Sequence, residues 1–237
     1  MHVCRRQAVD PPSSSDDLLI RPSARGPLAE MHGHLRPWAG TMQPEAMTDT
    51  DPFTLAPARV HEAMGRNRRA FALFQAARHP GRLVWVLPAH ASELPLPQGL
   101  PDGIATRLHL VRITNETDLL WSVEEALRSQ PISLVIAEPG KPLSLTAGRR
   151  LQLAAEAGQT TGLMLIREGA GSNAAETRWN CTAIAGDQPD STLHQWEIIK
   201  NKSGTLRNWT VHWDGTTAAF DLVSKAGQRC QPQETPL

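Results

Sequence analysis

The chain has 237 residues, 40% of them hydrophobic, and its 24 Lys and Arg balance its 24 Asp and Glu. This size and composition suit one well-packed domain, and zero formal charge excludes a global field that would draw the protein to nucleic acid or an anionic membrane. Three cysteines without ligand spacing suggest no metal site, and the lack of a membrane-length apolar window and of a signal-peptide core predicts a cytoplasmic protein. No cofactor is expected, because the chain has no nucleotide-binding motif.

Residues 1–52 are rich in proline and serine and contain few aliphatic residues. Such a segment buries too little apolar surface to offset the entropy of ordering it, so we expect it to be disordered. The tail at 225–237 is expected to be flexible. Because Met31, Met42 and Met47 precede the first order-forming sequence, one hypothesis is that the biological start is internal.

Residues 53–224 predict one α/β domain. The run at 58–64 fits either a short strand or a helical turn. Beyond it the periodicity predicts helices at 68–79, 118–129 and 147–158, and buried strands at 83–87, 108–113, 132–137 and 162–166. This alternation is typical of a mostly parallel sheet flanked by helices. Later strand-like runs, at 177–184, 193–199, 208–213 and 218–222, predict an antiparallel carboxyl-terminal extension.

The helix at 118–129 and the strand at 132–137 form the centre of the predicted domain. The apolar residues of the helix recur at three- and four-residue steps. Glu124 and Glu125 lie on the other side and diverge by about 100°, so we expect them to face solvent or a partner and not to act as a catalytic pair. Trp121 is expected either under the sheet or exposed to a partner.

Four tryptophans gather in the carboxyl-terminal half: Trp179, Trp196, Trp209 and Trp213. Aromatic residues on antiparallel strands usually pack across strands or against a covering helix, and we expect the same here. A platform that stacks nucleobases is the alternative, but it needs exposed rings flanked by cations.

No phosphate loop, nucleophile elbow, dinucleotide fingerprint or zinc motif occurs in the chain. The position nearest to a phosphate loop, at 65–69, lacks the second glycine, the lysine and the hydroxyl. Arg68 and Arg69 would either hold an anion at a helix amino terminus or form a solvated basic turn, the commoner case for a short charge run. Glu138 ends the central strand where open α/β sheets carry metal-holding acids, but without a phosphate loop it is expected to have nothing to hold.

The run LLWSVEEALRS followed by ISLVIAE, with RRAFALFQAAR and LVWVLP before it and GRRLQLAAEAG after it, resembles the ImuA family of bacterial damage-inducible proteins. These are distant relatives of RecA, and the resemblance covers roughly residues 57–222. It implies a degenerate RecA-like core. The segment EIIKNK resembles the RecA segment whose lysines touch the neighbouring subunit's nucleotide, which implies that Lys200 and Lys202 lie on a protein–protein surface.

Relative to RecA, the phosphate-loop groups are lost near Arg68 and Arg69, and no activating acid stands around Ala89 and His90. The stretch at 167–175, which corresponds to a DNA-contacting loop, is short, glycine-rich and acidic. The resemblance therefore implies a non-catalytic accessory protein of damage-induced translesion synthesis. The implied partners are an ImuB-type homologue of Y-family polymerases, RecA, and indirectly an error-prone polymerase and DNA.

Two other functions stay open. The first is a SulA-like inhibitor of cell division that binds FtsZ, because SulA-type proteins share the shortened RecA-like core of the ImuA family. The second is a nucleotide-dependent RecA-like ATPase whose unusual phosphate site is built from Arg66, Arg68 and Arg69.

Overall fold

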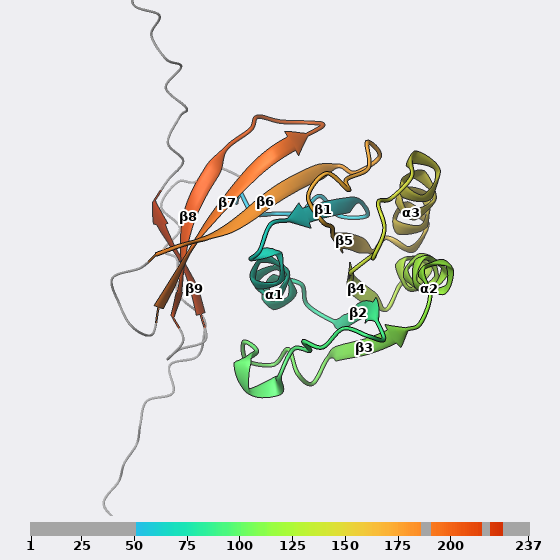
Figure 1. Ribbon diagram of the computed structural model, residues 1–237, viewed down its shortest axis with the longest axis horizontal. Helices are drawn as coiled ribbons and strands as arrows, with labels where there is room; N and C mark the ends of the chain where they lie inside the picture. Colours follow the sequence, from blue (N-terminus) through green and yellow to red (C-terminus); the bar gives the residue numbers. More distant parts are fainter. Residues whose placement is uncertain (1–50, 186–190, 215–218, 225–237) are drawn as a thin grey trace, which may run out of the picture. The chain divides into compact units, whose positions relative to one another are not determined.

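The computed structural model describes residues 51–185, 191–214 and 219–224. Their strands are β1 Val60–Met64, β2 Arg82–Pro88, β3 Leu108–Ile113, β4 Ile132–Ala137, β5 Thr161–Leu165, β6 Thr177–Ile184, β7 Ser191–Asn201, β8 Asn208–Asp214 and β9 Ala219–Ser224. They form one nine-stranded sheet in the order β3-β2-β4-β5-β1-β6-β7-β8-β9 (Figure 1). The pairs from β3 to β6 are parallel, and those from β6 to β9 are antiparallel. This confirms the predicted fold class, and the run at 58–64 contributes a strand.

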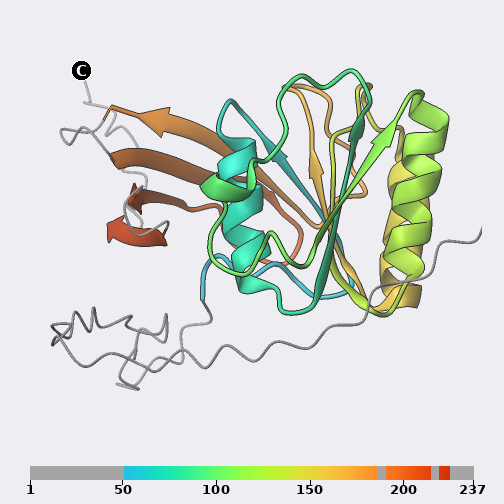
Figure 2. The same cartoon turned by 90° about the horizontal axis from the view of Figure 1, so that it is seen from below.

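Three helices stand among the described residues: α1 Arg68–Arg78, α2 Glu116–Arg128 and α3 Leu145–Gly158. The α1 helix covers one face of the sheet, and α2 and α3 lie side by side on the other (Figure 2). The Asn115 side chain caps α2 by accepting a 2.9 Å hydrogen bond from the Asp118 amide. A single 3-10 turn, Pro97–Gly99, interrupts the otherwise irregular connection between β2 and β3. None of the described helices is long and apolar enough to cross a membrane.

The core consists of two apolar layers separated by the sheet. Leu134 and Ile136 of β4 contribute to the α1 side, while Val135 and Ala137 contribute to the side of α2 and α3. All four are fully buried. The alternation follows from the two-residue period of a strand, and it confirms that β4 is covered on both faces.

The tryptophans of the antiparallel extension pack inward. Trp179, Trp196 and Trp209 are buried. The ring centroids of Trp179 and Trp196 lie 4.8 and 5.1 Å from that of Phe71 of α1, and Trp209 packs against Trp179 at 5.7 Å. On β9, Phe220 meets Phe74 of α1 at 5.5 Å. For these buried rings the packing interpretation is confirmed and the nucleobase platform is wrong. The extension is thereby joined to α1 by aromatic contacts.

The expected disordered segment at 1–52 lies outside the described residues apart from its last two, and so does the expected flexible tail at 225–237.

Candidate functional site

Ligands of open α/β sheets bind at the carboxyl ends of the strands, and here an ion pair stands at that edge. Arg69, in the first turn of α1, donates from Nε and Nη2 to the two carboxylate oxygens of Glu138, at 3.0 and 2.8 Å. Trp85 of β2 adds a 3.0 Å hydrogen bond from Nε1 to the same carboxylate. The side chains of Arg69 and Glu138 are 29% and 11% exposed. The pair therefore closes the space between the start of α1 and the end of β4.

This arrangement changes the sequence-based interpretation of both residues. The hydrogen bond to Glu138 is the largest cause that raises the pKa of Arg69, against a smaller opposing effect of burial. Glu93 pairs with the outer nitrogen of the same guanidinium at 2.8 Å. Glu138 thus binds Arg69, a partner that the sequence analysis did not foresee, while the expectation that Glu138 holds no metal stays a prediction. The available signals were a lone acid directly after a buried strand and an arginine at the start of a predicted helix, but nothing in the sequence pairs the two.

The turn before α1 is bonded to the antiparallel strands. Gly65 has a φ of +88°, and an added Cβ would lie 2.2 Å from the carbonyl oxygen of Cys181 on β6. That carbonyl accepts a 3.1 Å hydrogen bond from the Asn67 amide, and the Asn67 side chain bonds to His194 Nδ1 at 2.8 Å. Burial lowers the pKa of His194 to about 4, so the neutral ring accepts this bond near pH 7. The Asn67 amide, which in a phosphate loop would be free to bind a phosphate, is therefore already bonded to the Cys181 carbonyl.

Arg68 turns back on the same segment. Its Nη1 donates to the Gly65 carbonyl at 3.0 Å, and its Nε is buried without a hydrogen-bond partner among the described residues. The guanidinium thus packs against the turn that precedes α1.

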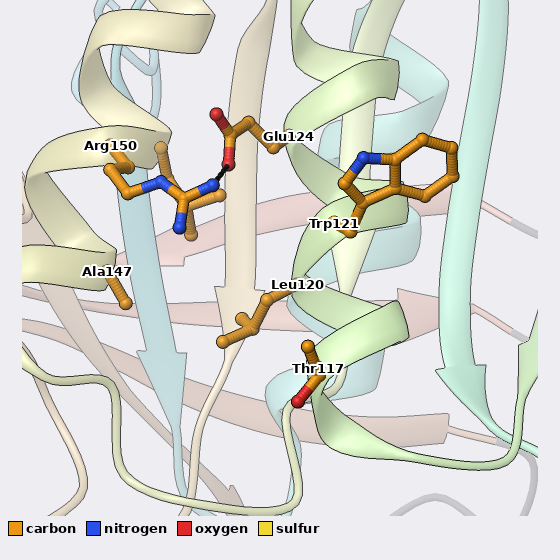
Figure 3. A pocket seen from close by; sticks show the side chains of 7 residues that line it. Thr117, Leu120, Trp121, Glu124, Ala147 and Arg150 are labelled. Carbon is orange, nitrogen blue, oxygen red and sulfur yellow. Dashed lines mark hydrogen bonds and ion pairs between the residues drawn. The ribbon is translucent and has the colours of Figure 1, made fainter.

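The prediction that Glu124 and Glu125 of α2 both face solvent or a partner is correct for only one of them. Glu125 is exposed and pairs with Arg128 at 2.9 Å. Glu124 is buried, and one of its oxygens binds Arg128 at 2.5 Å. The other oxygen binds Arg150 of α3 at 2.6 Å (Figure 3). The solvent-facing prediction was wrong for Glu124 because α3 packs beside α2 on that side, which the period of α2 alone does not reveal.

Trp121 lies on the exposed side of α2. The residue is 61% exposed, and its ring points away from Arg150 and Ala147 on α3 (Figure 3). Between the two helices lies a pocket of about 210 Å³, lined by Thr117, Leu120, Trp121, Glu124, Ala147, Arg150 and Leu151. Of the two placements left open for Trp121, the exposed one is correct.

Lys200 and Lys202 bind a loop of their own chain. Lys200 Nζ donates to the carbonyls of Asn173 and Ala175 at 2.8 Å each, and Lys202 Nζ donates to that of Ala174 at 2.7 Å. Burial is the largest cause that lowers the pKa of Lys200, followed by the charge of Arg178. Both amines hold the loop that follows β5, which is the stretch expected to correspond to a DNA-contacting loop. Their expected role at a subunit boundary stays a prediction.

Sequence reasoning missed a buried ion pair beneath the same loop. Glu62 of β1 is 1% exposed, accepts from Arg178 Nε at 2.8 Å and accepts from the Ser172 amide at 2.7 Å. An acid in the middle of a short strand, as in the run VHEAM, was the available signal. This signal identifies a buried charge but not its partner, because Arg178 is 116 residues away in the chain.

The six predicted site residues do not form one site. Arg68 and Arg69 lie on α1, whereas Glu124 and Glu125 lie on α2, which covers the opposite face of the sheet (Figure 2). Lys200 and Lys202 stand at the end of β7. Within the described ranges, no three His, Cys, Asp or Glu side chains gather as metal ligands would.

No protein-family model matches the chain. Two curated proteins are similar to it: Protein ImuA from Caulobacter vibrioides strain NA1000 / CB15N and Protein ImuA from strain ATCC 19089 / CIP 103742 / CB 15. Each is 41% identical over 126 residues, which cover 48% of this chain and 50% of the relative. The chain thus spans about half the length of the curated relatives it matches. Over that half the chain is similar to these ImuA proteins, which belong to the family that its helix and strand motifs resemble.

Proposed function

We propose that this protein is a non-catalytic, RecA-like accessory protein of DNA-damage-induced mutagenesis. The observation that carries the proposal is the ion pair between Arg69 and Glu138, at the edge of the sheet where a related ATPase would hold nucleotide and metal. The similarity to Protein ImuA supports the mutagenesis theme. By this proposal the protein keeps a RecA-like fold but no longer binds or hydrolyses a nucleotide.

Charge supports the loss of nucleotide binding. A triphosphate needs cations that are free to approach it, yet the guanidinium of Arg69 is neutralised by two carboxylates, those of Glu138 and Glu93. A bound nucleotide would have to displace Glu138 and leave its carboxylate with Trp85 alone. Burying a carboxylate without its cation is costly, so the internal pair competes directly with the ligand.

The partner side of the proposal follows the resemblance to the ImuA family. The protein would bind an ImuB-type homologue of Y-family polymerases and would act with an error-prone polymerase on damaged DNA, with RecA as a further partner. The exposed ring of Trp121 supports a protein-binding role, because large exposed aromatic side chains are enriched at interfaces.

Titration calorimetry with ATP and Mg²⁺ tests the non-catalytic part. We expect no binding tighter than about 1 mM, which corresponds to about −4 kcal/mol. A matched variant, Glu138→Gln, frees Arg69 from its main partner and should bind no more weakly than the natural protein. Micromolar binding that Arg69→Ala abolishes would show a working nucleotide site and overturn the proposal.

Pull-down of the ImuB-type protein by the purified full chain tests the partner. We expect a complex that persists without nucleotide. No association in the presence or absence of ATP and DNA would contradict the accessory role.

A further inference from the structure

The outer side of α3 and the loop after β5 form a second groove. It has a volume of about 520 Å³ and is lined by Leu145, Arg149, Gln152, Leu153, Asn173, Ala174 and Lys202. Leu145 and Leu153 are 46% and 65% exposed. The lining contains two cations and no acid.

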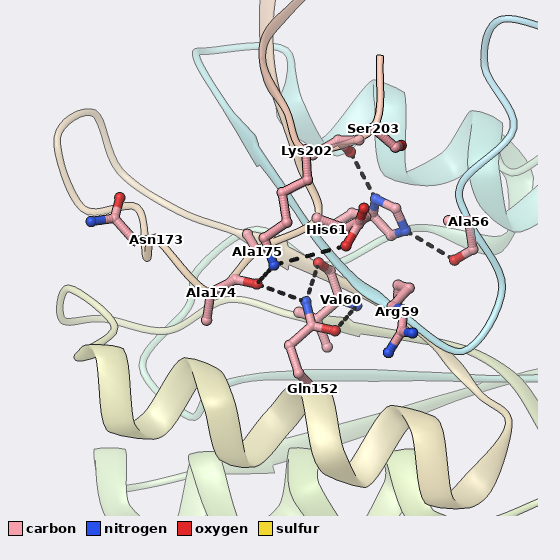
Figure 4. Close-up of polar contacts among 12 residues, drawn as sticks. Ala56, Arg59, Val60, His61, Gln152, Asn173, Ala174, Ala175, Lys202 and Ser203 are labelled. Atoms are coloured by element: carbon pink, nitrogen blue, oxygen red, sulfur yellow. Dashed lines mark hydrogen bonds and ion pairs between the residues drawn. The ribbon is translucent and has the colours of Figure 1, made fainter.

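The loop wall of this groove is held rigidly. Lys202 and Gln152 both donate to the Ala174 carbonyl, at 2.7 and 3.0 Å, from the strand side and from α3, while Asn173 points away from both (Figure 4). Gly148 brings α3 against the loop, because an added Cβ would lie 2.4 Å from Ser172 Oγ. A wall fixed in this way loses little entropy when a ligand binds.

The α3 wall presents a regular pattern. Leu145, Arg149 and Leu153 follow one another at four-residue steps and so lie on one stripe, with the leucines about 12 Å apart. Among the described residues Arg149 makes no hydrogen bond or ion pair, so its five donors are available. The complementary surface has two aliphatic groups about 12 Å apart with a carboxylate between them.

We propose that this groove binds an amphipathic helix of another protein, with aliphatic side chains two turns apart and a carboxylate midway between them. The helix would lie along α3, with its carboxylate on Arg149 and its aliphatic anchors against Leu145 and Leu153. This inference goes beyond the proposed function and does not depend on which protein carries the helix. Nucleic acid fits less well, since a phosphate chain calls for clustered free cations and Lys202 is already bonded within the protein.

Fluorescence anisotropy with the full chain tests the groove. The probe is a labelled 16-residue alanine and glutamine helix with leucines eight residues apart and a glutamate midway, and its twin carries lysine at the midway position. We expect the glutamate peptide to bind at least ten-fold more tightly than the lysine peptide. Arg149→Glu should reverse this preference, and Leu153→Asp should weaken both peptides at least ten-fold.

Leu96→Asp is the matched control, because Leu96 is 69% exposed and lies outside the groove, in the connection between β2 and β3. It should change the affinity less than two-fold. Equal affinity for the two peptides, or an unchanged preference in Arg149→Glu, overturns the inference. Tight binding of a single-stranded oligonucleotide that Arg149→Glu abolishes would assign the surface to nucleic acid and overturn it as well.

Discussion

The replacement Glu138→Gln isolates the contribution of the ion pair at the sheet edge. Glutamine keeps the shape of glutamate but has one accepting oxygen in place of two. Three donors converge on the carboxylate, namely Nε and Nη2 of Arg69 and Nε1 of Trp85. At least one donor therefore loses its acceptor, and the new amide nitrogen faces groups that can only donate.

The size of the effect follows from burial. A hydrogen bond to a charged group contributes about 1.5–3 kcal/mol, and the lower half of that range applies because Arg69 is 29% exposed and keeps Glu93. We expect Glu138→Gln to lower the free energy of unfolding by about 2 kcal/mol, or about 4–8 °C in Tm for a domain of this size. Arg69→Met should cost more, about 3 kcal/mol, because it leaves a carboxylate that is only 11% exposed without its cation.

Urea unfolding followed by tryptophan fluorescence measures these differences, and the double variant gives the coupling between the two residues. Glu93→Gln serves as the control: its carboxylate touches the same guanidinium but is 83% exposed, so we expect a change within about 0.5 kcal/mol. If Glu138→Gln unfolds at the same urea concentration as the natural protein, the pair contributes nothing and the reasoning fails.

Three further predictions concern other parts of the molecule. Gly148→Ala should destabilise the protein by about 1–3 kcal/mol because its methyl group would overlap Ser172, and chemical denaturation should reveal this; an unchanged midpoint would mean that the loop moves aside freely. Burial lowers the pKa of His61 and of His194 to about 4, so between pH 6.5 and 4 the unfolded chain binds more protons than the folded one. As the pH falls through that range, the free energy of unfolding should decrease by up to about 1.4 kcal/mol per pH unit for each ring. A pH series of urea midpoints measures that slope, which should be shallower in His61→Gln. Trp121→Ala should leave thermal melting within about 0.5 kcal/mol of the natural protein, since the ring is mostly exposed; a large loss in calorimetry would show that it packs in the fold.

The sequence by itself determined the elements and their order. The hydrophobic periodicity and the stop signals located α1, α2 and α3, because the buried face of an amphipathic helix has apolar residues three and four positions apart. The continuous apolar run of β4 likewise showed a strand covered on both faces. The absence of phosphate-loop glycines and lysine is also a property of the sequence alone.

Only the tertiary structure decided which charges meet. Arg69 and Glu138 are 69 residues apart in the chain, and Glu62 and Arg178 are 116 apart, so no local period connects the members of either pair. Glu124 was misplaced for the same reason, since its burial depends on α3 and not on α2. Parallel strands bring their carboxyl ends to one edge regardless of distance along the chain, and this places Glu138 beside Arg69. The register of β1 with β6 places Glu62 directly opposite Arg178.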